Sequence, residues 1–275
     1  MEINNQHLLG GDNVIQLDCP KNKDKFSKNL PDTIVIHYTA GSSAESSARY
    51  LCRNDVMASA HIVIGREGEI YQLVPFDTIA WHAGKSYYAG RDMLNRYSIG
   101  IELDNAGELT KTGSVYKSYF GREYTVNDVI AAPHRNDPSN KIKYWQSYTE
   151  KQLDKCRMVC EMLIDKYKIH TIVGHEEIAP GRKTDPGPAF PLDKFRYNLL
   201  EQNRSDKLTT ETKKGIVDTN LLNIRDDAGV NSTKVAKPLT RGTEVTILEE
   251  RNGWYKVETK ITGWVSKAFV KPENG

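Results

Sequence analysis

The chain has 275 residues, of which 38% are hydrophobic, enough for one large domain or for one medium and one small domain, each with its own core. Its 38 Lys and Arg residues against 36 Asp and Glu residues give a formal charge of +2, which favours neither nucleic acid nor an anionic membrane as a partner. The sequence lacks an apolar run long enough for membrane insertion, and residues 1–7 lack the basic and apolar pattern of a signal peptide, so we expect neither feature.

The first elements predict a sheet that begins after an irregular arm. Residues 1–30 contain a Gly-Gly pair and a lysine-rich run, which favour irregular structure. Residues 33–39, Thr-Ile-Val-Ile-His-Tyr-Thr, form a β-branched apolar run that predicts a buried strand, with His37 at its C-terminal end. A short helix is predicted from Ser43, and residues 61–74 predict two strands joined at a glycine turn.

The middle of the chain alternates strand and helix patterns around one long polar segment. Residues 98–103, Ser-Ile-Gly-Ile-Glu-Leu, predict a strand with Glu102 near its C-terminal end. Residues 104–147 are predicted to leave the compact domain as a long excursion, whose many aromatic side chains suit either stacking on sugar rings or packing within the excursion. A capping box then opens a helix over residues 149–168, and a short strand follows at residues 171–173.

Residues 174–190 are dense in groups that can bind a metal. His175 stands where a strand ends, and Asp185 follows across two Pro-Gly turns that allow its carboxylate to fold back beside the imidazole. If the strand of His37 is a parallel neighbour, both imidazoles emerge on one rim of the sheet. Three such ligands leave one position for water, as catalytic zinc sites do, and Glu102 is suited to act as the general base for that water.

The C-terminal part has a different pattern. Pro191 opens a closing helix, after which the sequence becomes charged and Thr-rich without periodicity, as linkers are. Short alternating runs separated by Gly or Asn turns follow and predict a small β-barrel. We therefore divide the chain into a first domain over residues 1–204, a linker over residues 205–214 and a second domain over residues 215–275.

Six motifs together resemble the zinc-dependent N-acetylmuramoyl-L-alanine amidases of the type 2 family, which include phage lysins and cell-wall recycling enzymes. The motifs are Ile-Val-Ile-His-Tyr-Thr (34–39), Ala-Ser-Ala-His-Ile-Val-Ile-Gly-Arg-Glu-Gly (58–68), Tyr-Gln-Leu-Val-Pro (71–75), Ala-Trp-His-Ala-Gly (80–84), Ser-Ile-Gly-Ile-Glu-Leu (98–103) and Val-Gly-His-Glu-Glu-Ile-Ala-Pro-Gly-Arg-Lys-Thr-Asp-Pro-Gly (173–187). The resemblance implies an α/β domain with a central mixed β-sheet flanked by helices. It also implies one bound zinc ion, held by His37, His175 and Asp185.

The same resemblance implies a reaction. The bond cut would be the amide between N-acetylmuramic acid and the L-alanine of the peptidoglycan stem peptide, with Glu102 handling the proton of the attacking water and Lys183 stabilising the oxyanion. Four further residues are candidates for substrate contact, with an ordinary surface position or loop bracing as the alternative: Trp81, His82, Asn95 and Arg182. Segments 222–225, 239–245, 252–257 and 262–265 resemble a bacterial SH3 module, which implies an all-β SH3-like barrel that binds the cell wall.

Two other functions were weighed against an enzyme. A non-catalytic peptidoglycan-recognition protein shares the resemblance, and an amidase-like domain can also serve only to attach a protein to an assembly such as a phage particle. The presence of all three ligands together with Glu102 and Lys183 favours an enzyme over an inactive receptor, and the sequence leaves open whether it is an antibacterial, phage endolysin-like amidase, a secreted lytic amidase or an enzyme that remodels its own wall. Synthesis in the cytoplasm without a signal peptide would then require a holin, a secretion apparatus or cell lysis before the enzyme meets peptidoglycan.

The remaining cysteines and histidines have simpler interpretations. Without an export signal, the four cysteines are expected to be reduced and mostly to fill the core, with a disulfide only after export. Cys156 and Cys160 share one face of the predicted helix. His61 is expected to be buried and hydrogen-bonded rather than bound to metal, and His134 to lie on the polar surface. His7 and His170 are expected to be solvated or locally hydrogen-bonded.

Overall fold

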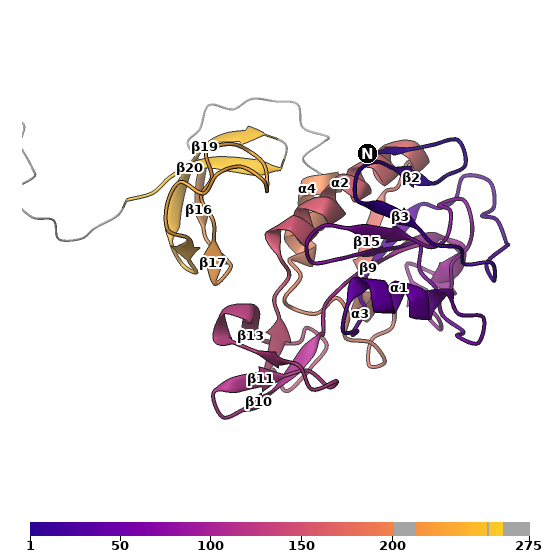
Figure 1. Ribbon diagram of the computed structural model, residues 1–275, viewed down its shortest axis with the longest axis horizontal. Helices are drawn as coiled ribbons and strands as arrows, with labels where there is room; N and C mark the ends of the chain where they lie inside the picture. Colours follow the sequence, from indigo (N-terminus) through magenta and orange to yellow (C-terminus); the bar gives the residue numbers. More distant parts are fainter. Residues whose placement is uncertain (201–212, 252, 261–275) are drawn as a thin grey trace, which may run out of the picture. The chain divides into compact units, whose positions relative to one another are not determined.

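The computed structural model describes residues 1–200, 213–251 and 253–260 (Figure 1). The chain forms two compact units, Met1–Asp206 and Lys207–Gly275. The division falls inside the predicted linker, but most of that linker lies outside the described residues, so its boundaries stay a prediction. Within the described residues, no helix has both the length and the apolar character needed to cross a bilayer.

A six-stranded mixed sheet forms the centre of the first unit. Its strands, in spatial order, are β15 (Thr171–Gly174), β4 (Thr33–Tyr38), β9 (Ser98–Leu103), β5 (Ile62–Ile64), β6 (Ile70–Gln72) and β3 (Val14–Gln16). All neighbours are parallel except β5 and β6, which form the predicted antiparallel hairpin. The register pairs His37 of β4 with Glu102 of β9, which places two predicted site residues side by side at the C-terminal ends of parallel strands.

Helices cover both faces of this sheet, and the strand sequences show why. Alternate residues of the central strands point to opposite faces. One set packs in a core with α2 (Glu150–Tyr167) and α4 (Leu192–Leu200), where Ile34 and Ile99 are fully buried. On the other face, Val63 packs with α1 (Ala44–Cys52). Burial of each such apolar side chain stabilises the folded state by about 1.5–3 kcal/mol. Because helices bury both faces of the sheet, the central strands are nearly continuous apolar runs.

The excursion after Glu102 is itself folded. It forms an antiparallel sheet with the strand order β12 (Glu123–Tyr124), β11 (Val115–Lys117), β10 (Glu108–Thr112), β14 (Ile142–Gln146) and β13 (Val129–Pro133), with a short 3-10 helix η2 (Val126–Asp128). We call these residues, Glu108–Gln146, the insertion sheet. Leu109, Tyr116 and Tyr124 are buried in a small core of its own. The aromatic side chains that suggested sugar stacking are therefore partly used in packing.

The N-terminal arm differs from the prediction of irregular structure. It contains the hairpin of β1 (Glu2–Ile3) and β2 (Leu9–Gly10), and it supplies β3, the edge strand of the central sheet. Beyond β3 it packs along the end of α1, where Cys19 and Cys52 form a disulfide with a Cα–Cα distance of 4.6 Å. The expectation of four reduced cysteines is therefore wrong for this pair, because packing of the arm brings the two residues together. Cys156 and Cys160 are free and buried, as expected.

The remaining short elements of the first unit surround the site. They are the hairpin β7 (Tyr87–Tyr88) and β8 (Arg91–Asp92), the 3-10 helix η1 (Leu94–Arg96), and the single-turn helix α3 (His175–Ile178). Helix α3 begins directly at the end of β15, so His175 is its first residue. The predicted strand over residues 171–173 therefore delivers His175 to the rim of the sheet, as the sequence pattern indicated.

The second unit is all-β within its described residues. It contains a sheet of β16 (Lys213–Ile216), β19 (Glu244–Arg251) and β20 (Trp254–Glu258), and a pair formed by β17 (Leu221–Leu222) and β18 (Leu239–Thr240). All of these neighbours are antiparallel. Strand β16 begins two residues before the predicted start of this domain at residue 215. The predicted strand near residues 262–265 lies outside the described residues.

Candidate metal centre and its surroundings

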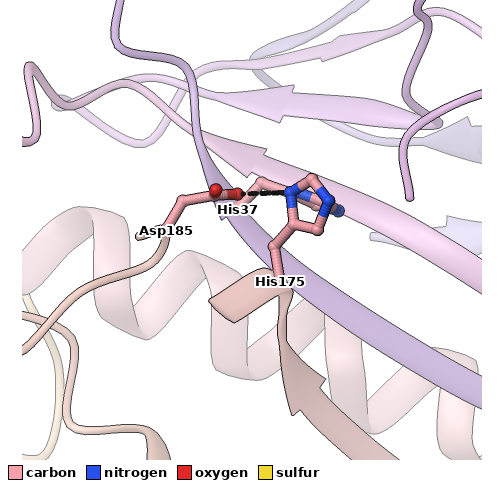
Figure 2. A group of neighbouring side chains, drawn as sticks. All are labelled: His37, His175 and Asp185. Atoms are coloured by element: carbon pink, nitrogen blue, oxygen red, sulfur yellow. Dashed lines mark hydrogen bonds and ion pairs between the residues drawn. The ribbon is translucent and has the colours of Figure 1, made fainter. Parts of the chain in front are cut away.

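Three predicted ligands converge at the rim of the central sheet (Figure 2). His37 comes from the end of β4, His175 from the start of α3, and Asp185 from the segment that follows. His37 Nδ1 lies 3.0 Å from His175 Nδ1, and each of these nitrogens lies 2.9 Å from Asp185 Oδ2. All three side chains are buried. We call residues 175–187, which carry two of these groups, the ligand loop.

Hydrogen bonds on the far sides of the two imidazoles assign their tautomers. His82 Nε2 donates to the Ser98 carbonyl at 3.1 Å, so His82 Nδ1 must accept, and it accepts from His37 Nε2 at 3.0 Å. The lone pair of His37 is therefore on Nδ1, the atom that faces Asp185. His175 Nε2 donates to the Ala83 carbonyl at 3.1 Å, which leaves its Nδ1 lone pair facing the same point.

The protonation states agree with this assignment. Burial, followed by the neighbouring His175, lowers the pKa of His37 to about 4, so its imidazole is neutral near pH 7. Burial also holds the pKa of His82 well below its ordinary value. For Asp185 burial acts to raise the pKa, but the contacts with His175 and His37 outweigh the burial and keep the carboxylate ionised. Two neutral imidazoles and one carboxylate are a donor set that suits a divalent cation such as zinc.

The site therefore fits a bound metal on its own chemistry. Three electron-pair donors converge within 3.0 Å of one another, and the tautomers leave no proton to share between them. Such a cluster is repulsive until a cation occupies the point where the lone pairs meet. The other ring nitrogen of each histidine donates a hydrogen bond to a fixed acceptor, His82 for His37 and the Ala83 carbonyl for His175, as is usual for metal-binding histidines.

Glu102 lies next to this cluster, opposite His37 in the strand register. Its Oε2 is buried and has no hydrogen-bond partner among the described residues. Burial, reinforced by the negative charge of Asp185 and partly offset by Lys183, raises the pKa of Glu102 to about 8. A buried carboxyl group without a partner is costly for the fold, and such groups gather at functional sites.

Lys183 lies in the ligand loop two residues before Asp185, as predicted, and its side chain is partly exposed. Its backbone N–H donates to the Ala179 carbonyl at 3.1 Å, which fixes the turn that presents it. The charge of its ammonium group helps to lower the pKa values of both His37 and Glu102. Lys183 is therefore electrostatically coupled to the metal cluster and to the candidate base.

The four predicted substrate-contact residues belong to the chain segment 81–85 or contact it. Trp81 and His82 lie in the segment, and Asn95 and Arg182 hydrogen-bond to its backbone. His82 is only 8% exposed and lies behind His37. Asn95 Oδ1 accepts from the backbone N–H groups of His82 and Ala83, at 3.0 and 2.7 Å. Arg182 donates to the carbonyls of Ala83 and Lys85, at 2.9 and 2.7 Å. These contacts brace the segment, whereas Trp81 is half-buried at its start, with the Lys21 ammonium 6.0 Å from its ring centroid.

A close approach explains the glycine in Ser-Ile-Gly-Ile-Glu-Leu. A Cβ atom at Gly100 would lie 2.3 Å from Cγ of His82, so only glycine leaves room for the ring behind His37. His61 lies on the same side, fully buried, and accepts from the Gly100 N–H at 2.9 Å while donating to the Thr78 carbonyl at 2.9 Å. The interpretation of His61 as a buried, hydrogen-bonded residue is confirmed.

Sequence reasoning missed His134. It was predicted to lie on the polar surface, yet it is 5% exposed and its Nε2 lies 2.6 Å from Glu176 Oε2. The reason is that the insertion sheet folds back against α3, which the polar composition of residues 104–147 does not indicate. His7 also makes a distant contact, with the Tyr167 hydroxyl at 2.7 Å. His170 is exposed and contacts both the neighbouring Thr171 hydroxyl and the distant Asp32 carboxylate, whose Oδ2 lies 3.6 Å from Nε2.

Comparison with known proteins agrees with the fold and the site. The family described as N-acetylmuramoyl-L-alanine amidase matches residues 27–188, and the bacterial SH3 domain matches residues 220–271. The first match covers more than half of the chain and includes all three residues of the metal cluster. The chain therefore belongs to the N-acetylmuramoyl-L-alanine amidase family and carries a C-terminal bacterial SH3 domain.

Individual relatives come from several bacteria. The chain is 39% identical to 1,6-anhydro-N-acetylmuramyl-L-alanine amidase AmpD of Escherichia coli K12 over 146 residues. This alignment covers 52% of this chain and 60% of the relative. Over 167 residues the chain is 32% identical to N-acetylmuramoyl-L-alanine amidase AmiD of the same strain, covering 58% and 49%. A crystal structure of a selenomethionine derivative of AmpD aligns at 28% identity with a TM-score of 0.48, covering 73% of this chain and 99% of that one. The chain thus spans less than two thirds of the length of the two curated relatives.

Proposed function

We propose that the protein is a zinc-dependent peptidoglycan hydrolase that cuts the amide bond between N-acetylmuramic acid and the L-alanine of the stem peptide. One observation carries this proposal: Glu102, whose buried Oε2 has no hydrogen-bond partner among the described residues, lies beside a cluster of His37, His175 and Asp185 whose lone pairs converge. The family assignment and the amidase activities for which AmpD and AmiD are named support the choice of substrate.

The chain's own residues have separable tasks in such a reaction. A zinc ion held by the cluster would supply a water of lowered pKa and polarise the amide carbonyl. Glu102 takes a proton from the attacking water and delivers it to the departing nitrogen. The ammonium group of Lys183 offsets the charge that develops on the carbonyl oxygen, an effect on the order of 3 kcal/mol for one good donor. His82 keeps His37 in the required tautomer.

The environment of Glu102 suits a base that must also return its proton. In the protein without metal, burial raises its pKa to about 8. A nearby cation favours the ionised form, because opposite charges attract, and so lowers the pKa toward the working pH. The ideal pKa of a general base lies near that pH, since it must both accept and donate.

The same proposal assigns the partners and the place of action. The amidase unit acts on peptidoglycan, and the SH3 unit binds the cell wall. The disulfide between Cys19 and Cys52 supports action outside the cytoplasm, because such bonds persist in oxidising compartments. We infer that the enzyme reaches the wall through a holin, a secretion apparatus or lysis of the cell, in the manner of an endolysin.

Hydrolysis of purified peptidoglycan tests the proposal. Wild type and Glu102→Gln are compared for zinc content by elemental analysis and for released products by mass spectrometry. We expect wild type to free stem peptides that begin with L-alanine, and the variant to retain zinc but to be nearly inactive. If zinc is bound and no bond is cut in any type of wall, the protein is a non-catalytic recognition protein instead.

A further inference from the structure

The insertion sheet leaves the central sheet directly after Glu102 and rejoins the fold just before α2, so both of its ends are close to the site in sequence. The proposed reaction gives it no task. Its connection between β13 and β14 contains three consecutive polar residues, His134, Arg135 and Asn136, that all reach the ligand loop. Their contacts show what the insertion sheet does in the folded protein.

The first contact is made by His134 to a buried carboxylate. His134 Nδ1 accepts from the Asn136 N–H at 3.2 Å, so its Nε2 carries the proton and donates to Glu176 Oε2 at 2.6 Å. The same Nε2 lies 3.2 Å from the carbonyl oxygen of Thr184. His134 therefore joins the two ends of the ligand loop, one residue from His175 and one residue from Asp185.

Its two neighbours strengthen this connection. Asn136 Nδ2 donates to the Glu176 carbonyl at 2.7 Å, and Arg135 forms ion pairs with Glu176 and Glu177. Glu176 is 2% exposed, and its N–H in turn donates to the Asp185 carbonyl at 2.7 Å. The Glu176 carboxylate is thus held by the charged Arg135 and by the N–H group of His134, and breaking either contact leaves a buried charge poorly compensated.

A second contact holds the far end of the ligand loop. Trp145 of β14 packs against Gly187, where an added Cβ would lie 3.2 Å from the indole and where the backbone has a φ of +70°. Just beyond the insertion sheet, the Tyr148 hydroxyl donates to the Pro186 carbonyl at 2.8 Å. The ligand loop is thus held by contacts both before and after Lys183 and Asp185.

We propose that the insertion sheet is a positioning device for the ligand loop, and that His134 is the positioning residue that couples the two. Without this contact Thr184 and Glu176 lose their shared donor, so the segment that holds Lys183 and Asp185 gains freedom. The consequence for the proposed hydrolase is a less ordered metal cluster and a misplaced Lys183. The inference rests on the proposed function only for its effect on turnover, since the order of the loop can be measured directly.

The test uses the full-length protein with His134→Phe, which keeps a ring against Trp145 but removes the donor. Hydrogen exchange by mass spectrometry over residues 179–187 should become about tenfold faster, and zinc affinity should fall about tenfold, within the range seen when groups behind metal ligands are lost. His134→Gln retains an N–H donor and should recover a large part of both. The matched control is Tyr119→Ala, at a side chain of the same insertion sheet that is 78% exposed, and it should change neither.

Two results would overturn the inference. The first is a His134→Phe protein whose exchange over residues 179–187 and zinc affinity equal those of wild type. The second is faster exchange across β4 and β9 as well as the loop, which would show that His134 supports the whole unit. Failure of the proposed function looks different: wild type would cut no amide bond, while the exchange rates of the loop in wild type and in the variants would still differ as expected.

Discussion

Among the described residues, the ammonium group of Lys183 forms no ion pair or hydrogen bond, and its charge acts on the pKa values of His37 and Glu102. We expect Lys183→Met to lower kcat by about 10²- to 10³-fold with little change in KM, because the developing oxyanion loses one donor. Steady-state hydrolysis of a soluble muropeptide measures this. Lys85→Met is a suitable control, since Lys85 is exposed and only its carbonyl is engaged. A loss of zinc from Lys183→Met would contradict the assigned role.

His82 supports the candidate metal site through its hydrogen bond with His37. Replacing it with Phe removes the acceptor that fixes the His37 tautomer, so we expect zinc affinity to fall about 10- to 100-fold. Competition with a zinc chelator measures the change, with His170→Phe as the exposed control. Gly100→Ala should produce a similar loss by displacing the His82 ring. Equal affinities in all of these proteins would show that the hydrogen bond between His82 and His37 has no such effect.

The raised pKa of Glu102 makes the stability of the metal-free protein depend on pH. Its pKa is about 8 in the folded state against 4.5 for an ordinary glutamate, so the folded state binds more protons between these values. The free energy of unfolding should therefore fall as pH rises through this window, and Glu102→Gln should flatten the dependence. Urea titrations of chelator-treated protein between pH 5 and pH 9 measure it. A wild-type slope that equals that of the variant would contradict the burial of an unpartnered carboxyl group.

For single residues, the sequence identifies the three candidate ligands better than the residues that hold them in place. His37, His175 and Asp185 could be found because each follows a recognisable strand or turn signal within a family motif. His82 occurs in such a motif and Asn95 lies outside all of them, but for both residues the sequence cannot show whether their polar atoms face the substrate or the backbone. His134 has no local signal, because its partner Glu176 is 42 residues away and belongs to another element.

Helix α2 illustrates a prediction at the scale of one element. Thr149 accepts from the Gln152 N–H at 3.1 Å, which is one half of the predicted capping box, and it also donates to the Arg66 carbonyl at 2.5 Å. The other half does not form, because the Gln152 side chain donates instead to the carbonyls of Ile64 and Asp104, both at 3.0 Å. We expect Thr149→Ala to reduce the free energy of unfolding by about 1 kcal/mol or somewhat more, whereas Thr149→Ser should be nearly neutral. Denaturant unfolding checks this. A neutral alanine variant would mean that water replaces the cap.

Elements were predictable where their pairing partners share one pattern. The strands around His37, Glu102 and His175 are apolar, so each strand could be predicted from sequence, and their parallel pairing, which the sequence left as a condition, is shown by the register. The insertion sheet was not predictable in the same way. Its strand β10 pairs with β14 across more than thirty residues, and a polar composition with exposed strand faces gives no clear alternation. The prediction for the N-terminal arm was wrong for the same reason, since its strand β3 pairs with β6, which is distant in sequence.

At the scale of the whole molecule, the change of pattern after the closing helix correctly indicated two units of different class. We expect residues 1–206 alone to cleave soluble muropeptides at a rate close to that of the full chain, because the amidase unit has its own core. Retention on insoluble peptidoglycan in a co-sedimentation assay should fall at least about tenfold, since a second binding module raises the effective affinity. Unchanged retention would show that the SH3 unit does not contribute to binding of the cell wall.

The disulfide between Cys19 and Cys52 closes a covalent ring in the chain, and strand β4 with His37 lies inside that ring. A protease that cuts one exposed bond between these cysteines therefore leaves the two pieces of the unit joined. The strand that carries the first metal ligand cannot leave the sheet by a single nick. In surroundings that contain proteases, a cross-link at this position therefore protects the candidate metal site from loss of the strand that carries His37.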